Sequence, residues 1–123
     1  MGMTMAEKVL ARASGRDSVR PGEFVTGHID VLMVNDHSFP EAYAGMLKRG
    51  HQKVFDPDKI VVVIDHFFPA ANIKYAEDHF NIREAVKKQG IKNFYDAGVG
   101  ICHQVLPEKG HILPGQLLSL IHI

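Results

Sequence analysis

An aspartate and a histidine, Asp65 and His66, stand side by side directly after the apolar run of residues 60–64. A carboxylate next to an imidazole can hold the ring in one tautomer or raise its pKa, which prepares it to donate a proton. Ligands of open α/β sheets bind beyond the carboxyl ends of the strands, where this pair is expected to lie. The pair is therefore a candidate acid–base site. The alternative is that Asp65 caps a turn and His66 is only solvated.

A second candidate, His103, follows the glycine-rich turn that contains Gly98 and Gly100. Glycine lets the backbone approach a ligand closely, but Gly-x-Gly alone lacks the rest of a dinucleotide-binding motif. A buried structural histidine next to Cys102 explains His103 equally well. Cys102 itself is more typical of a small buried apolar residue than of a nucleophile.

A third polar cluster, Asn35-Asp36-His37, ends the apolar run of residues 29–34. The alternative is that these residues cap the helix predicted to begin near Pro40. We interpret His79 as a surface residue of a later helix. If the three clusters converge on one cleft, their residue types fit proton transfer or metal binding.

The segments that must position these clusters alternate between strand and helix patterns. Residues 60–64 are all β-branched and apolar, which is typical of a strand buried on both faces. Further strands are predicted at residues 23–26, 29–34 and 91–96, and helices over residues 5–14, 40–49 and 72–89. Such alternation predicts one α/β domain, with a parallel or mixed sheet flanked by helices.

The composition narrows the classes of function. The chain has 123 residues, and its 14 Lys and Arg balance its 14 Asp and Glu, so we expect no nucleic-acid partner. It has no apolar run long enough to span a membrane, so no membrane partner is expected. Its single cysteine, Cys102, fits a reducing, cytoplasmic compartment and cannot supply the thiolates of an iron–sulfur cluster.

Three segments together resemble the aconitase family. They are residues 1–8, Val-Val-Val-Ile-Asp-His over residues 61–66, and Gly-Ile-Cys-His-Gln-Val-Leu-Pro-Glu-Lys-Gly over residues 100–110. Within that family the likeness is to the large subunits of 3-isopropylmalate dehydratases, and it covers residues 1–115. The resemblance implies part of a three-layer aconitase-type domain.

The resemblance also implies a hydro-lyase of leucine biosynthesis, which isomerises 2-isopropylmalate to 3-isopropylmalate by dehydration and rehydration. A [4Fe-4S] cluster in such enzymes acts as a Lewis acid on the substrate hydroxyl. By matching position, Asp65 and His66 correspond to a pair that helps to protonate the departing hydroxyl, and His103 to a histidine near the substrate oxygen. Asn35 and Asp36 fall where relatives contact the substrate.

Two departures from the family concern the end of the chain. Relatives continue after Gly115 into a Gly-Ala-Asp-Ser-His-Thr stretch, whereas residues 116–123 differ here, and the cluster cysteines of relatives come far downstream. We therefore expect the N-terminal part of the iron–sulfur domain in residues 1–115 and a non-native or truncated tail in residues 116–123. Such a fragment would not hold the cluster and would be inactive alone. The implied partners are a small hydroxy-acid and a small swivel-domain subunit.

The same residues also fit other members of the family and other classes of protein. Within the family, the chain could derive from a homoaconitase, a 2,3-dimethylmalate dehydratase or an aconitase. Outside it, Asp65, His66 and His103, with His37 as a further ligand, could form a stand-alone metal-binding domain for zinc or non-haem iron. A third interpretation is a non-catalytic fragment that folds poorly because it exposes apolar surface.

Overall fold

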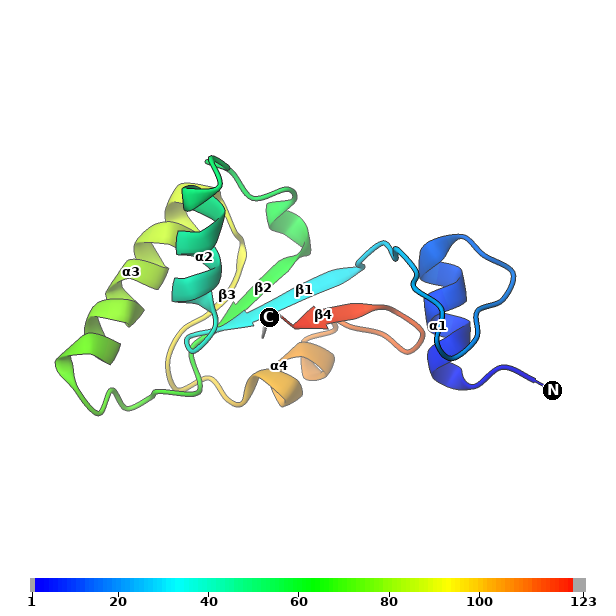
Figure 1. Ribbon diagram of the computed structural model, residues 1–123. Helices are drawn as coiled ribbons and strands as arrows, with labels where there is room; N and C mark the ends of the chain where they lie inside the picture. Colours follow the sequence, from blue (N-terminus) through cyan, green and yellow to red (C-terminus); the bar gives the residue numbers. More distant parts are fainter. Residues whose placement is uncertain (1, 121–123) are drawn as a thin grey trace.

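A parallel sheet of four strands lies between helices in the protein, whose computed structural model describes residues 2–120 (Figure 1). The strands are β1 (Val31–Asn35), β2 (Ile60–Val63), β3 (Asn93–Tyr95) and β4 (Leu118–Leu120), in the order β3-β2-β1-β4. All three pairings are parallel, with Val34 opposite Val62 and Met33 opposite Leu120. The predicted α/β fold is confirmed.

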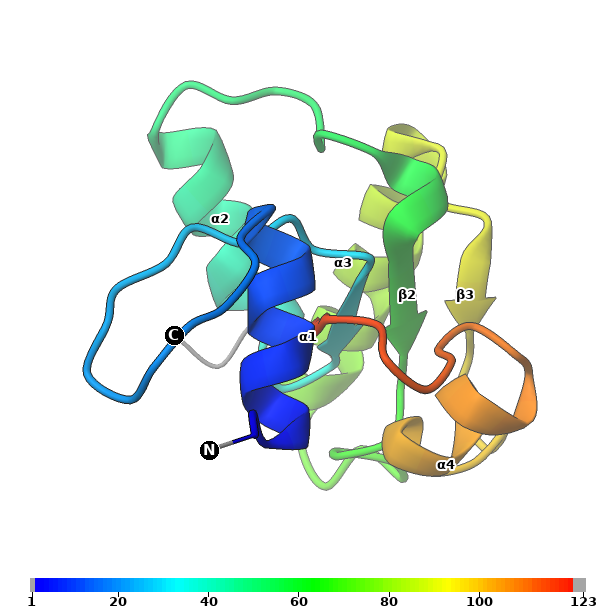
Figure 2. The ribbon, with the colours of Figure 1, turned by 90° about the vertical axis from the view of Figure 1, so that its right-hand side faces the viewer.

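Helices α2 (Phe39–Lys48) and α3 (Ile73–Gln89) cover one face of the sheet, and α4 (Cys102–Glu108) covers the other. Helix α1 (Met5–Ser14) lies at one end of the sheet, and Figure 2 views the molecule from that end. A short 3-10 helix, η1 (Pro57–Lys59), leads into β2. The layers are therefore helix, sheet and helix.

Local sequence signals account for where the helices begin and end. Thr4 and Glu7 form a reciprocal capping box at the start of α1, and Gly15 ends that helix in the left-handed conformation, at a φ of 66°. The side chain of Asn72 accepts the backbone N–H of Tyr75 at the start of α3.

The core consists of two apolar clusters, one on each face of the sheet. Val62 and Ile64 pack with Ile82 and Val86 of α3 on the first face. Met33, Val61 and Val63 pack with Val105 and Leu106 of α4 on the second. Because β2 is buried on both faces, its run of β-branched residues needs no polar alternation.

The strand order sets where polar residues gather. The chain runs from β1 through α2 to β2 and through α3 to β3, and it then passes through α4 to β4 on the other side of β1. The order of strands therefore reverses between β1 and β4. In doubly wound sheets, ligands bind beyond the carboxyl ends of the strands near such a reversal.

The strand predicted at residues 23–26 is absent: Phe24 is 99% exposed, and β1 is already paired with β2 and β4. In the region expected to be a tail, Leu118–Leu120 pair with β1, whereas residues 121–123 lie outside the described residues. The boundary at residue 115 stays a prediction. None of the helices within residues 2–120 is long and apolar enough to cross a membrane.

Candidate functional site

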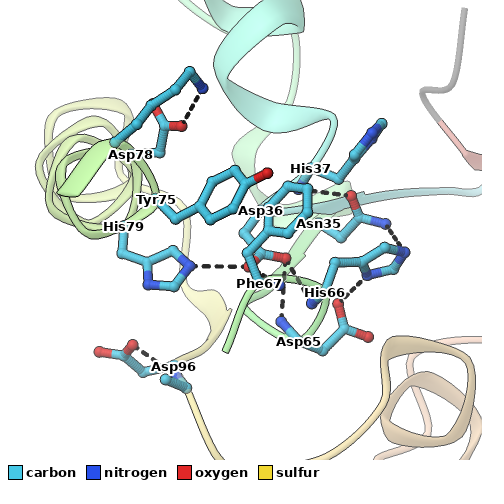
Figure 3. Close-up of polar contacts among 12 residues, drawn as sticks. Asn35, Asp36, His37, Asp65, His66, Phe67, Tyr75, Asp78, His79 and Asp96 are labelled. Atoms are coloured by element: carbon cyan, nitrogen blue, oxygen red, sulfur yellow. Dashed lines mark hydrogen bonds and ion pairs between the residues drawn. The ribbon is translucent and has the colours of Figure 1, made fainter. Parts of the chain in front are cut away.

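Two loops that leave the carboxyl ends of β1 and β2 are joined by one carboxylate, that of Asp36 (Figure 3). Asp36 accepts the successive backbone N–H groups of Asp65, His66 and Phe67, at 3.2, 2.9 and 2.9 Å. Its Oδ2 also lies 2.9 Å from Nε2 of His79, on α3. Asp36 thus connects three elements of the fold at the predicted edge of the sheet.

The Asp36 carboxylate is buried, yet it stays ionised at neutral pH. Burial raises the pKa of Asp36, but hydrogen bonds from the amides of His66 and Phe67, from the His79 ring and from the amide of Asp65 outweigh it. The net effect lowers the pKa below its ordinary value of 3.8. Because an ionised carboxylate only accepts hydrogen bonds, Nε2 of His79 carries the proton between them.

Asp65 and His66 form the hydrogen-bonded pair that the sequence suggested. Nδ1 of His66 is 2.6 Å from Oδ1 of Asp65, whose other oxygen accepts the backbone N–H of Cys102 at 2.6 Å. The Asp65 side chain is 4% exposed, whereas that of His66 is 39% exposed. The carboxylate is therefore held from inside, and the imidazole faces outward.

Asn35 and Asp65 contact the two ring nitrogens of His66 from opposite sides of the ring. Its Oδ1 accepts the backbone N–H groups of His37 and Ser38, so its Nδ2 is the atom that lies 3.3 Å from Nε2 of His66. Since Nδ2 is a donor, Nε2 must offer a lone pair, and the ring proton is then on Nδ1, facing Asp65. The lone pair of Nε2 thus faces the Asn35 amide, and the Nδ1–H faces Asp65.

Aromatic rings support the loop that holds the pair. Phe67 stacks on Tyr75 of α3, with ring centroids 4.0 Å apart and an angle of 5° between the planes. His37 lies beside both rings of the loop, 5.5 Å from Phe67 and 6.2 Å from His66. The loop after β2 is therefore packed against α3 as well as hydrogen-bonded to Asp36.

Cys102 and His103 begin α4 but differ in their surroundings. Cys102 is fully buried, and burial is the main cause that raises the pKa of its thiol to about 11. It is a neutral core residue at physiological pH, which agrees with the interpretation from the sequence. His103 is exposed, and among residues 2–120 no hydrogen bond joins it to Asp65 or His66. Its role near the substrate oxygen therefore stays a prediction.

His79 is the residue that the sequence reasoning placed wrongly. It is buried, 5% exposed, and bonded to Asp36, whereas a surface position was expected. The signal was its spacing: His79 lies four residues after Tyr75 and three before Ile82, on the inward stripe of α3. A histidine at such a position needs a buried partner, and the sequence does not show which one.

Within residues 2–120, the site offers ligands for a single metal ion but not for an iron–sulfur cluster. One oxygen of Asp65, one nitrogen of His66 and the sulfur of Cys102 lie within 4.8 Å of one another, which would allow a single ion. His103 and His37 are not in this group. A [4Fe-4S] cluster requires several cysteine thiolates, and the chain has one, with a raised thiol pKa. These residues therefore do not fit the cluster on their own.

The fold and the pair at its edge define a parallel α/β domain with a candidate acid–base site. No protein-family model matches the chain. The chain is, however, 50% identical over 118 residues to a probable 3-isopropylmalate dehydratase large subunit of Methanothermobacter thermautotrophicus. It is also 50% identical to a 3-isopropylmalate dehydratase large subunit of Methanopyrus kandleri and 49% identical to that of Aquifex aeolicus, each over 118 residues.

These alignments cover 96% of the chain but only 28%, 28% and 27% of the relatives, respectively. The resemblance to 3-isopropylmalate dehydratase large subunits is therefore confirmed along nearly the whole chain. The chain itself spans little more than a quarter of the length of these relatives.

Proposed function

We propose that this chain is part of the large subunit of a 3-isopropylmalate dehydratase of leucine biosynthesis, acting in the cytoplasm. The support is its 50% identity to named large subunits over 96% of its length. The observation that carries the chemistry is the Asp65–His66 hydrogen bond at the carboxyl edge of the parallel sheet. The corresponding substrate is a small hydroxy-acid.

The pair suits proton transfer at the substrate hydroxyl. A hydroxyl leaves a carbon more easily as water, so dehydration needs a proton donor beside the departing oxygen. His66 would give that proton from Nε2, and the buried carboxylate of Asp65 would stabilise the ring while it is positively charged. In rehydration, the neutral ring takes a proton back from the incoming water.

Asn35 and His103 are the other proposed contacts of this chain with substrate. In the present arrangement the Asn35 amide donates toward Nε2, so it must release that atom before the ring can be protonated there. The amide is then free to bind a substrate oxygen. His103 is exposed on the first turn of α4, next to Cys102, whose backbone N–H binds Asp65, and is the second proposed contact with substrate.

The cofactor and the partner belong to the part of the enzyme that this chain does not span. When bound, a [4Fe-4S] cluster supplies Lewis-acid chemistry at the hydroxyl. We propose that its cysteines lie in the remainder of the large subunit, and that the base for the carbon-bound proton comes from a small swivel-domain subunit. This chain contributes the hydroxyl-side proton donor.

The proposal is tested in a complete large subunit. Residues 1–115 of this chain replace the aligned segment of the Aquifex aeolicus large subunit, which is purified without oxygen together with its small subunit. Turnover of 2-isopropylmalate is expected, and His66→Gln should lower kcat by about 100-fold or more. The matched control His51→Gln changes an exposed histidine away from the site and should leave kcat unchanged.

Two results would contradict the proposal. An assembled, cluster-loaded chimera without turnover on any of the family's hydroxy-acids would refute the assignment to this class of enzyme. Preference for another hydroxy-acid over 2-isopropylmalate would show that residues 1–115 change the substrate choice of the Aquifex aeolicus enzyme, which would favour the homoaconitase, dimethylmalate dehydratase or aconitase alternatives.

A second candidate function is metal binding, which is favoured by the group formed by Asp65, His66 and Cys102. Equilibrium dialysis of the 123-residue chain against zinc measures it. One tightly bound ion per chain, lost in both His66→Ala and Cys102→Ala, would support this function. Unchanged zinc binding in those variants would rule out this group as the ligand set.

A further inference from the structure

The Asp36 carboxylate does more than fill a polar position in the core. Its two oxygens receive three consecutive backbone N–H groups, those of Asp65, His66 and Phe67. Three successive amides that point at one charge fix the backbone of this loop, because turning any of the peptides away would leave the buried Asp36 carboxylate short of a donor. The backbone of the acid–base pair is thus held by a residue from another strand.

His79 holds Asp36 in turn. Its side chain is 6% exposed and that of Asp36 is 0% exposed, so the contact between Nε2 and Oδ2 is shielded from water. In a dry setting such a bond is strong and directional, and its loss leaves a buried charge poorly compensated. One turn earlier on the same helix, Tyr75 stacks on Phe67. Helix α3 therefore contacts the loop directly, through Tyr75, and indirectly, through the bond between His79 and Asp36.

The geometry of the pair depends on this support. The orientation of the His66 ring is set by two bonds, from Nδ1 to Asp65 and from Asn35 to Nε2. Asn35 and Asp36 are neighbours in the chain, and Asp36 bonds the amides of both Asp65 and His66. A shift of Asp36 would move both partners of the ring relative to each other.

We propose that Asp36 and His79 are positioning residues that hold the Asp65–His66 pair in its acid–base geometry (Figure 3). This inference rests on the proposed function for its consequence in catalysis, but its structural content can be measured on the chain alone. Asp36 was expected from the sequence to contact the substrate, but its side chain is 0% exposed and both of its oxygens are bonded within the protein. Asp36 and His79 would therefore act through the backbone of the loop and not on the reacting atoms.

The first experiment uses nitrogen-15 NMR of the 123-residue chain. The wild-type His66 ring is expected to show a protonated Nδ1 and an unprotonated Nε2, together with slowly exchanging amides at His66 and Phe67. Asp36→Asn removes the charge and one acceptor oxygen, and it should give a mixture of ring tautomers and faster amide exchange. Asp78→Asn is the matched control, since it neutralises an aspartate next to His79 that bonds Lys74 instead.

A second pair of variants covers the case in which Asp36→Asn does not fold. His79→Gln keeps a side-chain N–H that can reach Asp36, whereas His79→Leu keeps only the volume. The wild-type tautomer and amide protection in His79→Gln, with their loss in His79→Leu, would support the proposal. A folded His79→Leu chain whose His66 ring and amides match the wild type would overturn it.

The second experiment asks whether the geometry matters for the reaction. In the chimeric dehydratase, His79→Leu should lower kcat by up to about 100-fold with little change in KM, and His79→Gln should restore it. A wild-type kcat in His79→Leu would overturn the catalytic part of the inference. If the chimera lacks turnover even with His79 in place, the proposed function is refuted instead. The NMR result then still decides whether Asp36 and His79 position the pair.

Discussion

Asp36 and His79 lie 43 positions apart in the sequence, and their side chains meet in the core with 2.9 Å between Oδ2 and Nε2. Asp36 follows β1, His79 belongs to α3, and the amides that Asp36 also binds follow β2. The loop that holds Asp65 and His66 is therefore placed by two other elements of the fold. This arrangement makes the stability of the domain and the geometry of the site depend on the same carboxylate.

Replacement of Asp36 by alanine should destabilise the fold strongly. Asp36→Ala removes the acceptor of three backbone N–H groups and leaves His79 without its buried partner, so a loss of about 3–5 kcal/mol is expected. Urea unfolding followed by circular dichroism measures it. The control Asp58→Ala breaks an exposed ion pair with Lys92 and should cost no more than about 1 kcal/mol. Equal losses in the two variants would contradict the role given to Asp36.

The same carboxylate should make stability fall in acid. The pKa of Asp36 is lowered in the folded protein, so the folded state binds this proton more weakly than the unfolded state. Its contribution is therefore complete above the ordinary pKa of 3.8 and is lost as pH falls below that value through the folded-state pKa. The free energy of unfolding, measured in urea at pH values on both sides of 3.8, should fall more steeply in wild type than in Asp36→Asn. Parallel curves would exclude Asp36 as a source of the acid sensitivity.

Much of this architecture could be predicted from short-range patterns. The β-branched run of residues 60–64 becomes β2 because a strand covered on both faces needs apolar residues throughout. The caps at Thr4 and Asn72 depend only on contacts three residues away, so they are readable in the sequence. Asp65 and His66 were identified as a pair because adjacency placed them together at the end of that strand.

What the sequence did not reveal depends on contacts between distant segments. His79 occupies the inward stripe of α3, but its partner Asp36 comes from another loop, so the residue type suggested an exposed histidine. Residues 23–26 have strand-like composition, yet the neighbouring positions beside β1 are taken by β2 and β4. Strand pairing is a property of the whole sheet, and local propensity cannot decide it.

Asn35 offers a test of how the His66 proton is placed. Asn35→Asp should keep an oxygen for the amides of His37 and Ser38, but it replaces the donor next to Nε2 with a second acceptor. The ring would then lie between two carboxylates and should hold a proton on each nitrogen at neutral pH. Nitrogen-15 shifts of the ring report this directly. Asn93→Asp, remote from the ring and bonded to the carbonyl of Asp58, is the control. Ring shifts in Asn35→Asp that match the wild type would contradict the contact between the Asn35 amide and Nε2.

Cys102 should lower the stability of the folded domain in alkali, and its thiol should react slowly with thiol reagents at neutral pH. Burial raises the pKa of its thiol from 9.0 to about 11, so the folded state keeps the proton more tightly than the unfolded state. This contribution to stability is complete below pH 9 and is lost as pH rises from 9 toward 11.

Because the side chain is 0% exposed and protonated, the folded chain should react with Ellman's reagent far more slowly than the urea-unfolded chain at the same pH. In Cys102→Ala, the free energy of unfolding should fall less between pH 9 and 11 than it does in the wild type. Rapid reaction of the folded chain at neutral pH would show instead that the sulfur is an accessible thiolate, which would strengthen the metal-binding alternative for Asp65, His66 and Cys102.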